Sequence, residues 1–189
     1  AMLRSLLDGL AYVHDCGVLH RDIKPANIFL RDLESPMFID FGLCNDTEYT
    51  ALTDAGSVVG TPGFLPPEAL AGSPQTPHWD QFALALSMLR VWKGVDVHAM
   101  GGAREGGDQV QRILSSLGSR TYLVEARKLL SGQTRLEAAI LRALSPEPAS
   151  RFPDARAMLA ALDPIVVDPR RGARRPVSSP PTRPPGAGL

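Results

Sequence analysis

The amino-acid sequence predicts a mainly α domain that carries one small β-hairpin. Apolar residues recur at helical spacing near the start of the chain and again over most of its second half. Between these regions two short apolar runs flank a polar turn, which is the pattern of a hairpin. With 189 residues and a hydrophobic content of 44%, the chain is long enough to bury one core.

The first predicted element is an amphipathic helix over residues 2–15. Its apolar residues share one helix face, and they include Leu3, Leu6, Leu7 and Leu10. Gly17 follows this pattern, and glycine is the residue that most commonly ends a helix. We therefore expect the helix to end before residue 18, where the next segment begins.

The predicted hairpin comes next. Residues 27–30 and 37–39 are the two apolar runs, and residues 31–36 form the polar turn between them. Residues 43–66 then show no periodicity and are rich in Thr, Ser, Asp, Gly and Pro. A loop of this length inside a domain is commonly functional, so we interpret it as a regulatory segment.

Helical patterns occupy most of the second half. They cover residues 79–92, 106–117, 121–130, 133–144 and 153–162, with breaks at Gly94, Gly118, Gly132 and Pro146. After Pro164 the composition shifts to Pro, Arg, Gly and Ser, which predicts a disordered tail or linker. We therefore expect a domain over residues 1–162 and a tail over residues 163–189.

Charge and cysteine content exclude several classes of partner. Twenty basic residues balance twenty acidic ones, so no net field favours nucleic acid or an anionic membrane. No apolar run approaches the roughly 18 residues that a membrane span requires. Cys16 and Cys44 have neither metal-ligand spacing nor the density of a disulfide scaffold. We expect a cytoplasmic domain with no nucleic-acid partner and no membrane insertion.

Two motifs point to phosphoryl transfer. His20-Arg21-Asp22 is followed by Asn27 in the pattern H-R-D-x-x-x-x-N, and Asp40-Phe41-Gly42 supplies D-F-G after the predicted hairpin. At this spacing the chain resembles the protein kinase family, and specifically the C-terminal lobe of a serine/threonine protein kinase. The resemblance covers about residues 1–162.

The resemblance implies a role for each polar residue of these motifs. Asp22 would orient the acceptor hydroxyl and take its proton, and Lys24 would stabilise the transferring phosphate. Asn27 and Asp40 would hold Mg²⁺, and Lys24, Asn27 and Asp40 would together contact ATP. The implied cofactors are ATP and Mg²⁺, and the implied substrate is a protein with a Ser or Thr hydroxyl.

Other residues match structural positions of the family. They are His20, Phe41, Gly42, Glu68, Asp80 and Arg151. Glu68 lies in Pro66-Pro67-Glu68, where the family has A-P-E, and it would pair with Arg151. Asp80 would hydrogen-bond the backbone of the catalytic loop. We interpret His14 and His98 as ordinary helix or loop residues.

Regulation by phosphorylation is a further implication. Arg21 would clamp a phosphate on the segment between Asp40 and Glu68. Ser57 is the first candidate for the modified residue and Thr53 the second, whereas Thr61 would position the substrate. Lys24 together with Thr61 is typical of the serine/threonine class.

The glycine-rich loop, the strand lysine and the helix glutamate of a complete kinase do not appear in this sequence. The chain also starts at Ala1 inside a helical pattern, so we expect a fragment whose N-terminal β-lobe is missing, and little activity from this chain alone. In bacterial kinases a basic, proline-rich stretch often leads to a membrane anchor, which would lie beyond residue 189.

The alternative is an inactive half-kinase that acts as a binding or scaffolding module. A small-molecule phosphotransferase of the aminoglycoside kinase type is a third alternative, and Arg21 and Phe41-Gly42 argue against it.

Overall fold

The structure is a computed structural model, and it describes residues 2–31, 35–41, 61–100, 109–132 and 134–163. The described residues form seven α-helices, which are α1 (Met2–Asp15), α2 (Pro77–Lys93), α3 (Val97–Met100), α4 (Gln109–Gly118), α5 (Thr121–Leu129), α6 (Arg135–Ala143) and α7 (Ala155–Ala161). Short 3₁₀ turns lie at η1 (Pro25–Asn27), η2 (Pro62–Phe64), η3 (Pro67–Ala71) and η4 (Pro148–Ser150). Strands β1 (Ile28–Leu30) and β2 (Pro36–Phe38) form an antiparallel hairpin. The predicted fold class, mainly α with one small hairpin, is confirmed.

Helix α2 is the central element of the core. Every residue from Trp79 to Leu89 is buried, including polar ones, so the helix has no solvent face over three turns. It begins with Pro77, whose missing N–H costs nothing at the first helical position. It ends at Gly94, which has a φ of 68° in the left-handed region that favours glycine.

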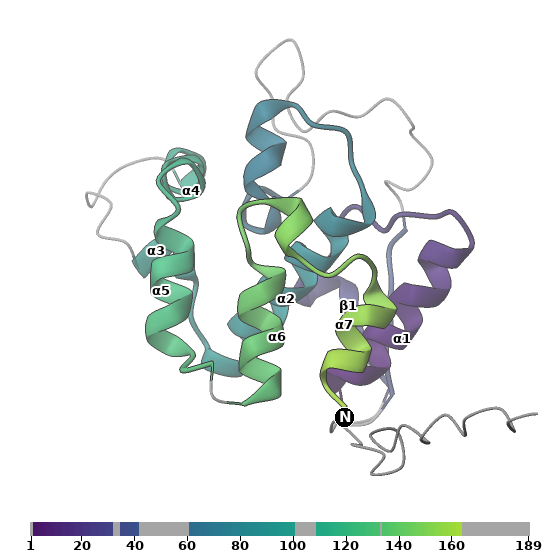
Figure 1. Cartoon of the computed structure of the whole chain (residues 1–189). Coiled ribbons are helices and arrows are strands. Elements are labelled where there is room, and N and C mark those ends of the chain that lie inside the picture. Colours follow the sequence, from purple (N-terminus) through teal and green to yellow (C-terminus); the bar gives the residue numbers. More distant parts are fainter. Residues whose placement is uncertain (1, 32–34, 42–60, 101–108, 133, 164–189) are drawn as a thin grey trace, which may run out of the picture.

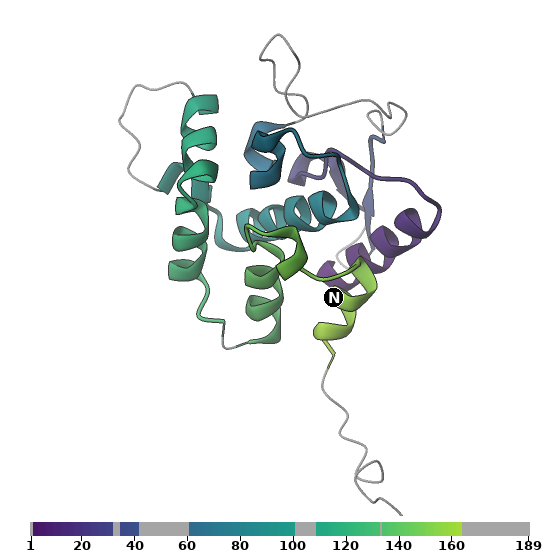
Figure 2. The same cartoon turned by 45° about the horizontal axis from the view of Figure 1, so that its top comes forward.

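The helices around the core contact one another in pairs. Helix α1 lies beside α7, α6 packs on α2, and α3 contacts both α4 and α5. Figures 1 and 2 both place the N-terminus beside the end of α7. Polar contacts join the two elements there, because Arg4 pairs with Asp163 and donates to the Leu162 carbonyl 2.5 Å away. Segments from opposite ends of the sequence are thus held together.

The hairpin lies one residue from the predicted position. Ile28 pairs with Phe38 and Leu30 pairs with Pro36, whereas the predicted runs were residues 27–30 and 37–39. The physical reason is local: Asn27 belongs to the 3₁₀ turn η1, and Pro36 occupies the first position of a strand, where its missing N–H is tolerated. Ile28 and Phe38 pack against the core.

Helix ends differ by up to three residues from the predicted ones, and the capping residues explain two of them. Helix α6 starts after Thr134, whose hydroxyl accepts from the Glu137 amide in a capping box. Helix α7 starts after Asp154, whose carboxylate accepts from the Ala157 amide. The short helix α3 was not predicted, because four residues are too few to display a helical period.

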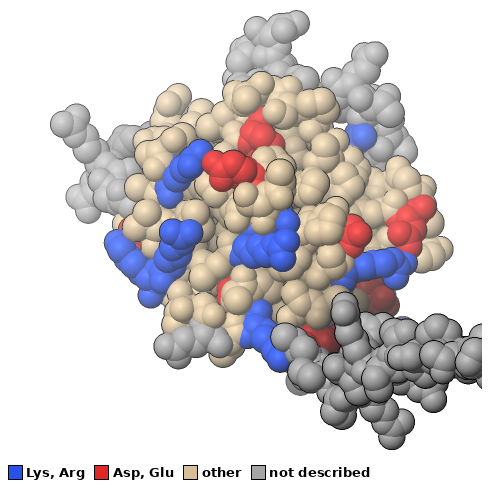
Figure 3. Space-filling view, in the orientation of Figure 1, with Lys and Arg blue, Asp and Glu red and all other residues tan. Residues whose placement is uncertain are grey.

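Surface charge is mixed. On the face seen in Figure 3, Lys and Arg side chains are interspersed with Asp and Glu side chains, and neither sign dominates. Exposed ion pairs occur as well, such as that of Arg120 with Glu147 at 2.8 Å. Within the described part of the chain, no helix is both long and apolar enough to span a membrane.

Candidate active site

The predicted catalytic loop, residues 20–27, starts on a buried histidine. The ring centroid of His20 lies 5.2 Å from that of Phe38 and 4.6 Å from that of Phe41. Burial lowers the pKa of His20 below its ordinary value, although the nearby carboxylates of Asp80 and Asp22 act in the opposite direction. His20 therefore anchors the loop to the hairpin and to the D-F-G phenylalanine.

The carboxylate of Asp80, in the first turn of α2, holds the loop backbone. Its Oδ2 accepts from the His20 amide and its Oδ1 from the Arg21 amide, both at 2.9 Å. Arg21 has a φ of 67°, a left-handed conformation that is unfavourable for a residue other than glycine. Two charge-assisted hydrogen bonds compensate for this strain and fix the backbone that leads into Asp22.

His14 is a third partner of the Asp80 carboxylate. Its Nε2 lies 2.8 Å from Asp80 Oδ2, and the two side chains are only 9% and 3% exposed. Nε2 donates here, because a carboxylate can only accept. The interpretation of His14 as an ordinary helix residue missed this contact. Only the fold brings His14 to Asp80, and no motif links the two.

Asp22 is the centre of a polar cluster. The Lys24 ammonium donates to Asp22 Oδ2 at 2.6 Å, and the Thr61 hydroxyl donates to Oδ1 at 2.8 Å. Asn27 Nδ2 lies 2.9 Å from both Oδ2 and the backbone oxygen of Asp22. Lys24 Nζ also lies 2.9 Å from Thr61 Oγ1, which closes the cluster. A carboxylate in this setting accepts hydrogen bonds from a hydroxyl and a cation together.

The hairpin brings Asp40 to the same end as Asn27. The Ile39 amide donates to the Asn27 carbonyl at 2.9 Å, and Asp40 follows with a left-handed φ of 60°. One carboxylate and one amide oxygen are hard ligands that suit Mg²⁺, which usually takes one or two protein ligands and completes its shell with water and phosphate. Among the described residues, no group of three or more His, Cys, Asp or Glu side chains converges. The ligand chemistry of Asn27 and Asp40 therefore fits a magnesium–nucleotide complex.

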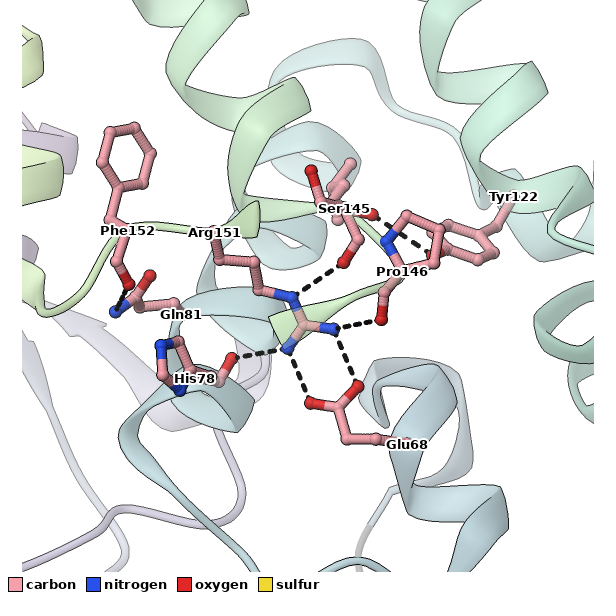
Figure 4. Close-up of polar contacts among 9 residues, drawn as sticks. Glu68, His78, Gln81, Tyr122, Ser145, Pro146, Arg151 and Phe152 are labelled. Atoms are coloured by element: carbon pink, nitrogen blue, oxygen red, sulfur yellow. Dashed lines mark hydrogen bonds and ion pairs between the residues drawn. The ribbon is translucent and has the colours of Figure 1, made fainter. Parts of the chain in front are cut away.

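Glu68 and Arg151 form a buried ion pair (Figure 4). Arg151 Nη1 and Nη2 each donate to one carboxylate oxygen of Glu68 at 2.7 Å. The remaining donors reach three backbone carbonyls, those of Ser145, His78 and Pro146. All five guanidinium N–H groups thus have acceptors, which is the condition under which a buried arginine is tolerated. The pair ties η3 to α2 and to the loop that follows α6.

Some predicted residues are not placed. Gly42, Thr53 and Ser57 lie outside the described residues. Arg21 is half-buried beside Asp22, with its backbone held by Asp80. Gln81 was assigned no role from the sequence, yet its side chain is buried and donates to the Phe152 carbonyl at 3.1 Å. Its position directly after Asp80, in a helix with no polar face, is a signal that could have found it.

The hairpin carries an exposed apolar patch. Phe29, Met37 and Ile39 lie on one face of the hairpin, because Phe29 pairs with Met37 and side chains alternate along a strand; we call them the hairpin patch, and each is between 39% and 50% exposed. The patch lies beside the polar cluster, because Asn27 and Asp40 flank the two strands. Large apolar side chains that gather in one place indicate a surface that another element covers.

Comparisons with known proteins agree with this geometry. Residues 1–152 match the protein kinase domain family. The serine/threonine-protein kinase PknA of Nostoc is 33% identical over 172 residues, which cover 88% of this chain and 28% of that protein. Serine/threonine-protein kinase D of Synechocystis is 33% identical, covering 87% and 31%, and PkaB of Streptomyces coelicolor is 28% identical, covering 89% and 42%. The chain thus spans less than half the length of these relatives.

Proposed function

The chain belongs to the protein kinase family, of the bacterial eukaryotic-like serine/threonine type, and from this premise we propose that it is the C-terminal lobe of a kinase that transfers the γ-phosphate of ATP to Ser or Thr hydroxyls of proteins. The observation that carries the proposal is the Asp22 carboxylate, which accepts from the Thr61 hydroxyl at 2.8 Å and from Lys24 at 2.6 Å. An acceptor hydroxyl and a transferring phosphate need these two groups side by side.

In this mechanism the protein orients groups more than it forms bonds. Asp22 accepts a hydrogen bond from the substrate hydroxyl, aligns it with the phosphate and takes its proton as the bond to phosphorus forms. Lys24 places its positive charge where negative charge develops on the transferred group. Thr61 contacts both side chains, so it limits the position that the acceptor can occupy.

Asn27 and Asp40 are the residues that would hold Mg²⁺. A bound Mg²⁺ would supply positive charge next to the phosphates of ATP. The contribution of this chain is to keep the two ligands at one end of a short hairpin, through the bond from the Ile39 amide to the Asn27 carbonyl. A serine/threonine preference is supported by Lys24 and Thr61, which are typical of that class.

An N-terminal lobe upstream of Ala1 is the second part of the proposal. The hairpin patch would pack against that lobe, which supplies the remaining ATP contacts, so this chain alone would transfer phosphate poorly. The alternative, an inactive half-kinase that binds other proteins, is supported by the same exposed patch. Activity measurements separate the two.

Regulation is the third part. Arg21 follows the buried His20 and precedes Asp22. A phosphate bound by the Arg21 guanidinium would therefore act on the residue directly before the proposed catalytic carboxylate. Phosphorylation of Ser57, or of Thr53, would supply that phosphate. Mass spectrometry of the active protein would locate the modified residue, and Ser57→Ala would lower the activity if that residue is the one.

The test compares the 189-residue chain with the chain joined to the segment encoded upstream. Each would be assayed for transfer of labelled γ-phosphate from ATP to a basic protein in the presence of Mg²⁺. We expect transfer only from the joined form, with a loss of about 10²- to 10⁴-fold for Asp22→Asn. If neither form transfers phosphate, the binding-module alternative is preferred.

A further inference from the structure

The molecule has an apolar groove that shares no lining residue with the polar cluster. It lies between the start of α1, the end of α2, and α6, and its volume is about 540 Å³. The lining includes Leu3, Met88, Val91, Trp92, Ile140 and Leu162. We call it the basal groove. No residue of the proposed active site lines it, so the proposed function does not account for it.

Two large apolar side chains that line the groove are exposed to solvent. Val91 is 52% exposed and Trp92 is 46% exposed, and they are neighbours on the last turn of α2. The Lys93 ammonium lies 4.2 Å from the centre of the Trp92 ring, which leaves the rest of the indole open. Adjacent exposed apolar residues in a concave site favour an apolar occupant.

The chain itself leaves the described fold at the rim of this groove. Leu162, just after α7, lines the groove, and its carbonyl accepts from Arg4, which lines it too. Asp163 then pairs with the same guanidinium. Figures 1 and 2 show the start of α1 and the end of α7 together at this point. The described part of the chain therefore ends at the rim, with Asp163.

The residues that follow Asp163 in the sequence have the apolar composition expected of a segment that binds in the basal groove. Ile165, Val166 and Val167 are three consecutive large aliphatic residues, and they come directly after Pro164. Beyond them, the only large apolar residues up to the end of the chain are Val177 and Leu189. The large aliphatic residues of 164–189 are thus concentrated at the sequence positions that follow Pro164.

We propose that residues 165–167 bind in the basal groove of their own chain and cover Trp92. Three extended residues span up to about 10 Å, which allows these side chains to enter a groove that starts at Leu162. Because the segment is tethered, it needs little intrinsic affinity to remain bound. The folded domain would then extend to about residue 167, beyond the boundary at residue 162 that the sequence predicts.

The test uses the tryptophan fluorescence of the 189-residue chain. Trp79 is buried, so acrylamide quenching reports mainly on Trp92. The triple variant Ile165→Ser, Val166→Ser, Val167→Ser should show stronger quenching, emission at longer wavelength, and a Tm lower by about 2–4 °C. Val177→Ser, ten residues further along, is the matched control and should behave like the parent chain.

A groove-side variant checks that the effect is a contact. Val91→Lys places a charge in the groove at a position that is already half exposed. Combined with the triple variant, its effect on Tm should be smaller than the sum of the separate effects, because both changes remove the same contact. Additive effects, or equal quenching of Trp92 in the parent and the triple variant, would overturn the proposal. Protection of Trp92 that grows with protein concentration would also overturn it, because a second copy would then cover the groove.

Discussion

The imidazole of His14 and the carboxylate of Asp80 are hydrogen-bonded at 2.8 Å, although 66 positions separate them in the sequence. The same carboxylate holds the His20 and Arg21 amides. One buried group on α2 therefore connects α1 to the backbone of the proposed catalytic loop. The contact suggests that α1 supports the geometry of Asp22 from a distance.

Loss of the His14 donor should destabilise the domain. His14→Ala leaves a buried carboxylate with one donor fewer, so we expect the free energy of unfolding to fall by about 1–3 kcal/mol. In His14→Gln the amide can still donate, so the free energy of unfolding should fall by a smaller amount. Urea denaturation measures both. Tyr12→Ala, at an exposed position of the same helix, is the control, and an equal loss there would contradict a specific role of His14.

The buried pair of Glu68 and Arg151 should matter far more than a surface pair. Arg151→Met strands a buried carboxylate, which we expect to cost about 3–5 kcal/mol of unfolding free energy. Arg120→Ala breaks the exposed pair with Glu147 and should cost less than about 1 kcal/mol. Thermal or urea unfolding of the two variants compares them directly. Similar losses would argue against a structural role for the buried pair.

Two buried histidines should make stability depend on pH. Burial lowers the pKa of His20 and of His98 in the folded state, while in the unfolded chain both titrate near 6.5. Below about pH 6.5 the unfolded state binds more protons, so the free energy of unfolding falls as the pH falls. Urea denaturation between pH 7.5 and 5.5 should show this, with a shallower slope in His98→Gln. An unchanged slope in that variant would remove His98 from the explanation.

Thr61 should affect transfer through its hydroxyl. In the complete kinase, Thr61→Val removes the donor to the Asp22 carboxylate, and we expect activity to fall by about 10- to 100-fold. Thr61→Ser keeps the hydroxyl and should retain most of the activity. Steady-state assays with ATP and a protein substrate distinguish the two. Equal losses in both variants would point to the methyl group and its packing instead.

Asp40 should control the requirement for magnesium. Asp40→Asn removes one negative ligand, so the Mg²⁺ concentration that gives half-maximal transfer should rise. Asp15→Asn, which breaks an exposed pair with Arg156, is the matched control and should leave that concentration unchanged. A magnesium titration of the complete kinase provides the measurement. The same titration curve for all three proteins would exclude Asp40 as a ligand.

The fold class and the family could both be predicted from the amino-acid sequence. Apolar periodicity located α1 and α2, and Gly17 and Gly94 marked where they end, because those signals are local and depend on a few neighbouring residues. The H-R-D and D-F-G motifs identified the family, since each is a short continuous string. Whether Ser57 or Thr53 is phosphorylated remains a prediction, because both lie outside the described residues.

The contacts between residues that are far apart in the sequence depend on how the helices pack. The sequence offered no reason to join His14 to Asp80, or to supply Arg151 with the carbonyls of Ser145, His78 and Pro146. The left-handed backbone of Arg21 was equally invisible, because no local pattern favours it and the Asp80 carboxylate compensates for its strain. Such contacts form when the buried faces of several helices pack together, and burial then makes each unpaired polar group costly. A local pattern can name the residues of a site, but packing selects the partners that hold them.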